Sequence, residues 1–309
     1  MKKMISVLGI FIILTVVAFN SVITVCAINP VETDRASSLT LKYSHNGKNY
    51  DNIEISTYRI ADVEENGVFT LTERFKDYYI NIYDITSQAE WEKITQTAAS
   101  YISADKLLPD AKAVTDEEGV VKFSGIKPGM YLTMSVRVEN NGEITIFEDF
   151  ITLIPQTDGK GVHNYDVSAF PKCRSYVPAP EKIEYKVVKQ WKDNGFSDKR
   201  PESIEIEIIR NGNVVSVQKL AADNNWSYKW TAPDDGSRWQ AVERNVPEGY
   251  TVSMVESGRT IIITNSYTEQ SVTPPQTGDI SVTWPYVVTM CISGGLIILL
   301  AIWSKRTEK

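Results

Sequence analysis

The sequence predicts a mainly β protein made of two tandem β-sandwich domains, with one helix inserted in the first domain. Short runs of alternating apolar residues, separated by turn signals such as Asn211-Gly212-Asn213, predict many short strands. A segment at 173–182 contains prolines that favour an extended backbone, which predicts a linker between domains at 37–172 and 183–268. A short segment at 28–36 precedes the first domain.

Residues 1–27 have the pattern of a secretory signal peptide. A positive start, Met1-Lys2-Lys3, precedes an uncharged, mostly apolar run from 4 to 25. Small residues stand at the positions that a signal peptidase reads before its cleavage site. We therefore expect export of the protein and cleavage after Ala27.

The first domain is expected to be mainly β with one helix. Alternating runs predict strands at 39–43, 53–60, 120–123, 130–138, 144–153 and 165–170. Ser87-Gln-Ala-Glu90 is a capping box, which predicts the start of the helix. Apolar residues then recur at helical spacing, so that one helical face packs on the sandwich: Trp91, Ile94, Ala98, Tyr101 and Ile102.

Three polar residues of the second domain, Lys189, Glu243 and Asn265, occupy strand positions that alternation assigns to the core. The residues on the same faces are Tyr185, Val187 and Trp191 for the first, Trp239 and Ala241 for the second, and Ile261 and Ile263 for the third. Burial of these polar groups would cost several kcal/mol unless they satisfy one another. We therefore expect all three to meet inside the sandwich.

Several motifs of this domain resemble the B-type repeat domain of collagen-binding adhesins and pilins, which has an immunoglobulin-like fold. They are Lys189-Gln-Trp191, Arg200-Pro-Glu-Ser203, Asn225-Trp-Ser-Tyr228, Val242-Glu243, Pro247-Glu-Gly-Tyr250 and Ile263-Thr-Asn-Ser-Tyr267. The resemblance implies two tandem immunoglobulin-like sandwiches. It also implies a spontaneous isopeptide bond between Lys189 and Asn265, promoted by Glu243 and independent of any cofactor.

Burial suits this chemistry, because desolvation favours a neutral lysine amine and a protonated glutamic acid. Glu243 could then polarise the carbonyl of Asn265 and move a proton as ammonia leaves. The alternative is a buried ion pair of Lys189 and Glu243, with Asn265 as a hydrogen-bonding neighbour. A covalent bond would close a long loop, as a disulfide does.

The segment at 269–309 resembles the sorting signal of Gram-positive surface proteins that are cut by sortases. It contains Pro274-Pro275-Gln276-Thr277-Gly278, an apolar run at 282–303 and a basic tail at 304–309. The apolar run has about twenty residues, enough for a transmembrane helix. By resemblance, a sortase cysteine attacks the carbonyl of Thr277 and releases Gly278 onward. Pro274 replaces the leucine of the usual Leu-Pro-x-Thr-Gly signal, which leaves the class of sortase open.

The end of the first domain resembles the amino-terminal domain of major sortase-assembled pilins. Tyr165-Asp-Val-Ser-Ala-Phe-Pro-Lys172 is similar to their Val-x-Val-Tyr-Pro-Lys motif, whose lysine accepts the threonine of another subunit. The resemblance implies that Lys172 is the intersubunit acceptor. The alternative is an exposed lysine that only keeps the linker soluble.

Composition narrows the class of protein further. The chain has a net charge of −7 and a pI of about 5.1, which argues against nucleic acid as a partner. Cys173 is the one cysteine left after both cleavages, so no internal disulfide is expected. The two histidines have no neighbouring cluster of metal-ligand residues, so we expect no metal or cofactor.

These features together predict a backbone subunit of a surface pilus, polymerised from Thr277 to Lys172 and anchored to the cell wall. The expected partners are a class C-type pilin sortase, the housekeeping sortase, other copies of the chain, peptidoglycan and, where a fibre carries them, tip or base pilins. The alternative is an unpolymerised wall-anchored adhesin, or a pilus-base subunit, that binds a host ligand. Enzymatic turnover is not expected, since no catalytic set is visible beyond the Lys189 self-reaction.

Overall fold

The computed structural model describes residues 29–267 except for Asp84, Ser135 and Pro180. The signal peptide with Ala27, the sorting motif at 274–278 and the apolar run at 282–303 lie outside the described residues. Residues 29–158 and 162–267 belong to one compact unit. No helix of the described part of the chain is long and apolar enough to cross a bilayer.

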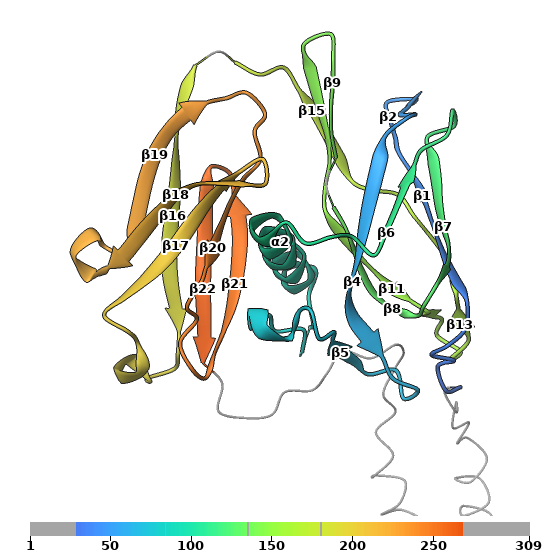
Figure 1. The fold of residues 1–309 in the computed structure, drawn as a ribbon, viewed down its shortest axis with the longest axis horizontal. Helices are drawn as coiled ribbons and strands as arrows, with labels where there is room; N and C mark the ends of the chain where they lie inside the picture. The colour runs from blue at the N-terminus through green and yellow to red at the C-terminus, as the bar shows by residue number, and fades with distance from the viewer. Residues whose placement is uncertain (1–28, 84, 135, 180, 268–309) are drawn as a thin grey trace, which may run out of the picture. The chain divides into compact units, whose positions relative to one another are not determined.

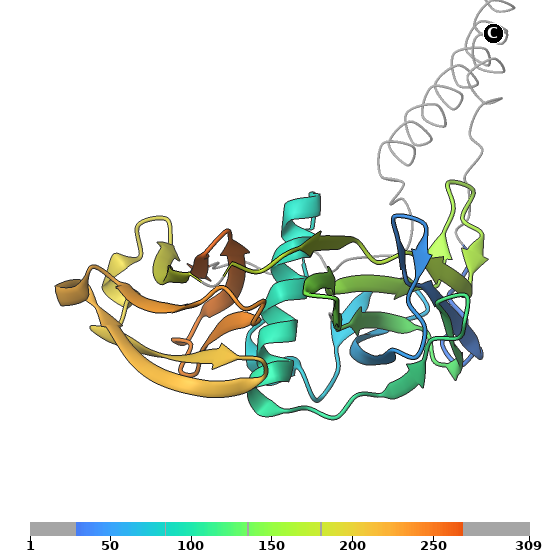
Figure 2. The same cartoon turned by 90° about the horizontal axis from the view of Figure 1, so that it is seen from above.

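Over the described residues, the prediction of a mainly β fold with one inserted α-helix is confirmed (Figure 1). The helix, α2 (Gln88–Asp105), begins at Ser87, whose hydroxyl accepts a hydrogen bond from the amide of Glu90. The carboxylate of Glu90 in turn accepts from the amide of Ser87, which completes the predicted capping box. Lys106 ends the helix in a left-handed conformation with φ 51°. Figure 1 views α2 nearly end-on, and Figure 2 views it from the side.

The amino-terminal part, as far as the structure describes it, contains three main sheets, in the orders β14-β1-β7, β11-β8-β4-β5 with β6 beside β4, and β15-β10-β9. Their strands are β1 (Ser37–Lys42), β4 (Glu54–Val63), β5 (Phe69–Leu71), β6 (Ala111–Val114), β7 (Val120–Ile126), β8 (Gly129–Thr133), β9 (Val136–Asn140), β10 (Glu143–Phe147), β11 (Phe150–Ile154), β14 (Asp166–Ala169) and β15 (Cys173–Tyr176). Two short hairpins accompany them: β2 (Ser44–His45) with β3 (Lys48–Asn49), and β12 (Gln156–Thr157) with β13 (His163–Asn164). The first strand pairs in parallel with β14, so the two ends of this part lie together.

The sequence-based strand boundaries differ from the structure where the chain passes between sheets. The single strands expected at 130–138 and 144–153 are each two strands. In each case one strand belongs to the β11-β8-β4-β5 sheet and the other to the β15-β10-β9 sheet. From Met130 to Val138 every second residue is apolar, so the alternation does not reveal that crossover. At 144–153 the charged pair Glu148-Asp149 interrupts the alternation where the chain changes sheet. In the segment expected to be a linker, Cys173–Tyr176 forms β15 and pairs with β10.

The carboxyl-terminal part is a two-sheet sandwich, with strand orders β19-β16-β22-β21 and β18-β17-β20. The strands are β16 (Lys182–Lys192), β17 (Ser203–Arg210), β18 (Asn213–Ala221), β19 (Ser227–Pro233), β20 (Trp239–Glu243), β21 (Tyr250–Ser257) and β22 (Thr260–Tyr267). Strands β16 and β22 are parallel neighbours. Alternate residues of both sheets fill the core between them, among them Val187, Ile206, Ile208, Ala241, Ile261 and Ile263.

Short 3-10 turns complete the described structure: η1 (Lys76–Tyr78), η2 (Ser197–Lys199) and η3 (Ala222–Asn224).

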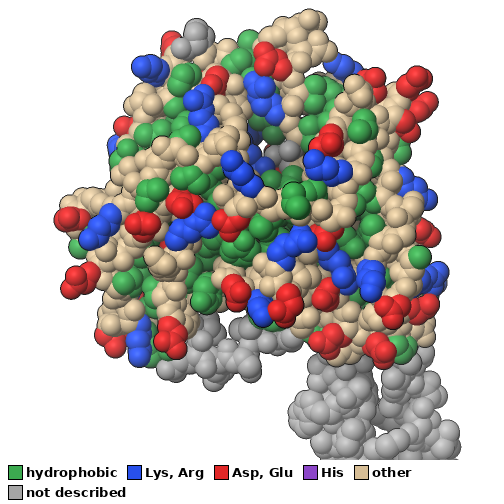
Figure 3. All heavy atoms as spheres, viewed as in Figure 1, with side chains coloured by type: hydrophobic (Ala, Val, Ile, Leu, Met, Phe, Trp, Pro, Cys, Tyr) green, Lys and Arg blue, Asp and Glu red, His purple; other side chains and the backbone are tan. Residues whose placement is uncertain are grey.

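On the face shown in Figure 3, lysine and arginine side chains are interspersed with aspartate and glutamate. This face therefore presents a surface of mixed charge and no continuous basic surface of the kind that tracks a nucleic-acid backbone.

Candidate functional site

The three predicted polar residues meet in the interior of the carboxyl-terminal sandwich. Lys189 comes from β16 and Asn265 from β22, in the same sheet, and Glu243 comes from β20 in the other sheet. The side chains of Lys189 and Glu243 are fully buried, and Asn265 is 0% exposed. The register pairs Lys189 with Ile263 and Trp191 with Asn265, so Lys189 and Asn265 are two register positions apart on adjacent strands, on the same face of the sheet.

Glu243 contacts both of the other residues. Its Oε2 lies 3.3 Å from the Lys189 Nζ. Its Oε1 accepts a hydrogen bond of 2.8 Å from the Asn265 Nδ2. Among the described residues, Asn265 Oδ1 has no hydrogen-bond partner, and the polar contact of Glu243 Oε2 is the long one to Lys189. Such buried, incompletely satisfied polar atoms are rare in native interiors and call for a chemical explanation.

Aromatic side chains form a wall beside the lysine. The Nζ of Lys189 is 4.0 Å from the ring centroid of Trp191, a cation–π distance, and also donates at 3.4 Å to the carbonyl of Gln190. The Trp191 ring meets Trp226 and Tyr250 edge to face. This wall separates the amine from solvent and increases its desolvation.

Burial shifts both titrating groups toward their neutral forms. Desolvation lowers the pKa of Lys189 to about 8, against the opposing effect of the nearby Glu243 carboxylate. Desolvation also raises the pKa of Glu243, against the opposing effects of Lys189 and of the hydrogen bond from Asn265. A neutral amine and a neutral carboxylic acid are therefore accessible together at this site.

The arrangement has the parts needed for amide exchange. A neutral lysine is a nucleophile, the side-chain amide of asparagine is an electrophile, and an acid that contacts both can transfer the proton. Holding these groups in a water-excluded interior replaces a bimolecular encounter with a unimolecular step. The same contacts also satisfy the ion-pair alternative, which differs only in whether the bond forms.

Lys172, the predicted acceptor, lies apart from this cluster in the sequence, between β14 and β15, and its side chain is exposed. Its main-chain carbonyl accepts a hydrogen bond of 2.8 Å from the amide of Glu148. The neighbouring Phe170 is 72% exposed. The backbone at Lys172 is thus fixed to the sheet while the amine faces solvent.

Two contacts near the predicted residues were not expected from the sequence. Cys173 is a free thiol, and its Sγ lies 3.0 Å from the Nδ1 of His45. The hydroxyl of Tyr101, expected only to pack in the core, donates at 2.9 Å to the main-chain carbonyl of Glu243. Neither partner could be found from spacing, because both contacts join segments that are far apart in the chain. The described residues contain no group of three metal-ligating side chains close enough to hold an ion.

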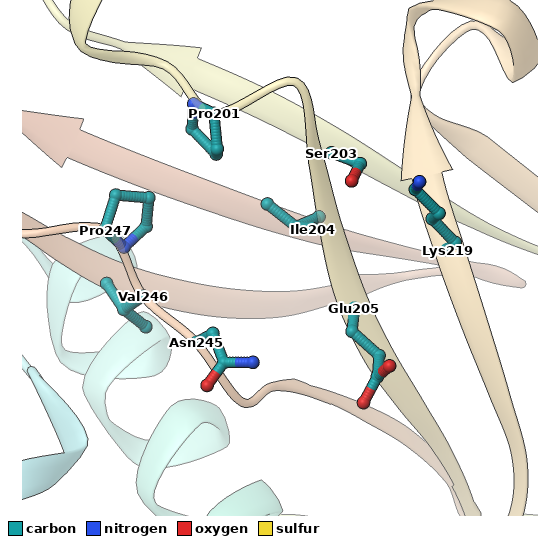
Figure 4. Close-up of a pocket in the computed structure, with 8 residues that line it drawn as sticks. All are labelled: Pro201, Ser203, Ile204, Glu205, Lys219, Asn245, Val246 and Pro247. Atoms are coloured by element: carbon teal, nitrogen blue, oxygen red, sulfur yellow. The ribbon is translucent and has the colours of Figure 1, made fainter.

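A shallow polar pocket lies elsewhere on the carboxyl-terminal sandwich (Figure 4). Glu205 and Lys219, which are cross-strand partners on β17 and β18, contribute its charged groups. The other lining residues are Pro201, Ser203, Ile204, Asn245, Val246 and Pro247. None of the predicted site residues lines it.

Comparison with known proteins identifies the domain in which the buried site lies. Residues 185–266 match the model of the Cna protein B-type domain. This stretch includes Lys189, Glu243 and Asn265, and it has the immunoglobulin-like fold of that domain. The domain family is structural and non-enzymatic.

One curated relative is the collagen adhesin of Staphylococcus aureus, which is 31% identical over 114 residues. The match covers 34% of this chain and 10% of the adhesin, so the chain spans about a tenth of that relative's length.

The solved structures to which the chain is similar include pilins and an adhesin repeat, all at low TM-scores. The major pilin SpaD of Corynebacterium diphtheriae is 17% identical, with 76% of this chain and 65% of that chain covered and a TM-score of 0.30. The shaft pilin SpaA of Lactobacillus rhamnosus GG is 12% identical, with 77% and 100% covered and a TM-score of 0.26. A single B repeat of the Staphylococcus aureus collagen-binding surface protein is 16% identical, with 76% and 98% covered and a TM-score of 0.27. Similarity at this level does not define a shared function.

Proposed function

We propose that the protein is the backbone subunit of a covalently polymerised surface pilus. A sortase cysteine attacks the carbonyl of Thr277, and the amine of Gly278 leaves. The ε-amine of Lys172 in a neighbouring subunit then attacks the enzyme-bound acyl group and releases the cysteine. A final transfer to a peptidoglycan amine anchors the fibre to the cell wall.

The observation that carries this proposal is the placement of Lys172. An acceptor lysine needs an accessible amine on a backbone with one fixed position, so that the sortase can bind it in one orientation. Lys172 is exposed, and its carbonyl is hydrogen-bonded to Glu148 at the start of β15. The sorting-signal resemblance at Pro274–Gly278 supplies the donor half of the same reaction.

The second part of the proposal is an isopeptide bond between Lys189 and Asn265. The Nζ of Lys189 attacks the Cγ of Asn265, and the bond from Cγ to Nδ2 breaks. Glu243 carries the lysine proton to Nδ2, which leaves as ammonia. The product ties β16 to β22, the first and last strands of the sandwich.

Such a tie suits a subunit that bears load along the fibre. In this proposal, force enters the second domain near β16 and leaves near Thr277, which follows β22 in the chain. Two parallel strands pulled in this way would separate by breaking their ladder of hydrogen bonds. A covalent bond between them carries the force instead. We include in the proposal a division into domains at 37–172 and 183–268, in line with the absence of any described sheet that combines strands of both.

A second candidate is a wall-anchored adhesin or pilus-base subunit in which Lys172 has no acceptor role. The identity to the collagen adhesin favours it, because that relative is named for adhesion to collagen. Both candidates retain the buried cross-link, so they differ in the fate of Lys172.

An immunoblot of wall extracts from the native host tests the pilus proposal. The comparison is between wild type, Lys172→Arg and Lys122→Arg; Lys122 is an exposed lysine on β7 and serves as the matched control. We expect a ladder of high-mass bands in wild type and the control, and a monomer band in Lys172→Arg. A monomer band in all three strains would favour the adhesin, and a ladder in Lys172→Arg would place the acceptor elsewhere.

A further inference from the structure

The helix of the amino-terminal part contacts the carboxyl-terminal sandwich through polar side chains. Five residues on one face of α2 make a hydrogen bond or ion pair to β20, to β21 or to Arg244: Gln96, Thr97, Ser100, Tyr101 and Asp105. Their spacing of one, four, five and nine positions from Gln96 follows the helical period, so they form a continuous stripe. We call this stripe the α2 polar face.

One end of the α2 polar face covers the open edge of a sheet. Strand β21 is at the end of the order β19-β16-β22-β21, so its outer amides have no strand partner there. The amide of Met254 donates to the hydroxyl of Thr97 at 2.8 Å, and that of Glu256 donates to the side chain of Gln96 at 2.6 Å. The amide of Val252 donates to the carbonyl of Tyr79 at 3.1 Å. Alternate outer amides of an edge strand are thus all satisfied, which fixes the position of α2 along it.

The other end of the α2 polar face contacts β20 at the residue that holds the candidate site together. The hydroxyl of Tyr101 donates at 2.9 Å to the main-chain carbonyl of Glu243. The next residue, Arg244, forms ion pairs with Asp105 of α2 and with Glu207 of β17. The backbone of Glu243 is therefore held by α2 at its own carbonyl and again one residue later.

The Tyr101 hydroxyl has little freedom to move. Tyr101 is 3% exposed, and its ring stacks on Tyr78 with centroids 4.5 Å apart. The hydroxyl of Tyr78 donates at 2.6 Å to Asp105 on the same helix. Burial raises the pKa of Tyr101 far above the physiological range, so its hydroxyl remains a hydrogen-bond donor.

We propose that Tyr101 is a positioning residue for the cross-link between Lys189 and Asn265, and that the bond forms at its full rate only when α2 is docked on β20. The inference rests on the proposed isopeptide bond. Glu243 has to contact the amine and the amide at once, and it is the last residue of β20. A strand end that is free to move would carry the carboxyl group away from one of its two contacts. Docking of α2 on the carboxyl-terminal sandwich therefore precedes formation of the cross-link inside that sandwich.

The test uses the full-length chain and follows the loss of one ammonia by intact mass after pulsed synthesis. Tyr101→Phe removes only the hydroxyl that donates to the carbonyl of Glu243. Thr97→Val is the matched control, because it removes another hydroxyl of the same helix, the one that accepts from the amide of Met254 on β21. We expect cross-linking in Tyr101→Phe to slow about tenfold, the rate equivalent of one net hydrogen bond. We expect Thr97→Val to remain close to the wild-type rate.

A rate–pH curve separates positioning from a general loss of stability. The charged and titrating groups that face the reacting pair are Arg200 and Tyr101, besides Lys189 and Glu243 themselves. Glu243 opposes the effect of burial on the pKa of Lys189, so a displaced Glu243 lets the lysine lose its proton at lower pH. The rising limb in Tyr101→Phe should therefore shift to lower pH, whereas a chain that is only less stable keeps the wild-type limb.

Three results would overturn the inference. Tyr101→Phe could cross-link at the wild-type rate, or both variants could slow equally with an unchanged rising limb; each would remove the special role of Tyr101 and leave the cross-link intact. Wild type could retain its ammonia, which would refute the cross-link itself and the inference with it. A slow Tyr101→Phe with a shifted limb, beside a fast Thr97→Val, supports it.

Discussion

The Nζ of Lys189 lies 3.3 Å from the Oε2 of Glu243, with both side chains fully buried. An isolated pair of this kind is weak evidence for stability, because the loss of hydration can exceed the attraction. Here the same carboxylate also holds the amide of Asn265 at 2.8 Å. The contacts of Glu243 with both residues therefore fit a cross-linking reaction as well as a simple ion pair. The two alternatives differ in the mass and stability expected of variants.

Glu243→Gln should abolish the cross-link with little change of shape. A glutamine cannot carry the proton from Lys189 to the leaving ammonia. We expect the intact mass to exceed the cross-linked mass calculated for this variant by one ammonia. The free energy of unfolding should fall by about 4 kcal/mol from loss of the loop constraint, before any effect of the unpaired lysine. Mass spectrometry and denaturant unfolding check both effects, and a Glu243→Gln chain that still lacks one ammonia would refute the assigned role.

Replacement of the pair by apolar residues separates a cross-link from an ion pair. In the double variant Lys189→Met and Glu243→Met, the volume of each buried side chain is roughly kept. If the pair were only ionic, removal of both charges would be neutral or stabilising. With a cross-link we expect a loss of about 4 kcal/mol in the free energy of unfolding. A double variant as stable as wild type in urea would favour the ion-pair alternative.

In the variant Asn265→Ala, the free energy of unfolding should depend on pH in the alkaline range. This variant keeps Lys189 as a free amine, whose pKa of about 8 lies below its ordinary value of 10.5. Between these values the unfolded chain binds more protons than the folded chain, so the free energy of unfolding rises with pH across that window. The total rise is of the order of 3 kcal/mol. Urea titrations of Asn265→Ala and wild type at pH 8 and 10.5 measure the difference.

Wild type is the control for this comparison, because an acylated lysine no longer titrates. Other tyrosines and lysines contribute equally to both chains and cancel. A parallel pH dependence in the two proteins would contradict the assignment of Lys189 as the acylated group. The raised pKa of Glu243 acts in the opposite sense, because the stability that it contributes is lost as pH rises from the ordinary value of 4.5 through the raised pKa.

The buried site could be predicted from the sequence because strand alternation is a local property. Lys189 and Asn265 each interrupt the apolar face of a regular strand, and their burial follows from that position. The helix could be predicted for the same reason, since Ser87 and Glu90 mark its start within four residues. The family resemblance then supplied the reaction that these residues suggest.

The remaining features depend on contacts between distant segments. The passage of the chain from the sheet of β8 to the sheet of β9 leaves no mark in the alternation from Met130 to Val138. The pairing of Cys173 with Phe147 is a tertiary contact, as is the hydrogen bond from Tyr101 to Glu243. The polar residues Gln96 and Thr97 of α2 carry no local signal in the sequence that a sheet edge will cover them.

The head-to-tail linkage is tested most directly by sequencing the linkage peptides of wall-extracted polymers by mass spectrometry. We expect a branched peptide in which the carbonyl of Thr277 is joined to the ε-amine of Lys172. The same digest should contain Lys189 joined to Asn265 within one chain. If Thr277 is recovered only on peptidoglycan or on another lysine, the proposed head-to-tail pilus is contradicted.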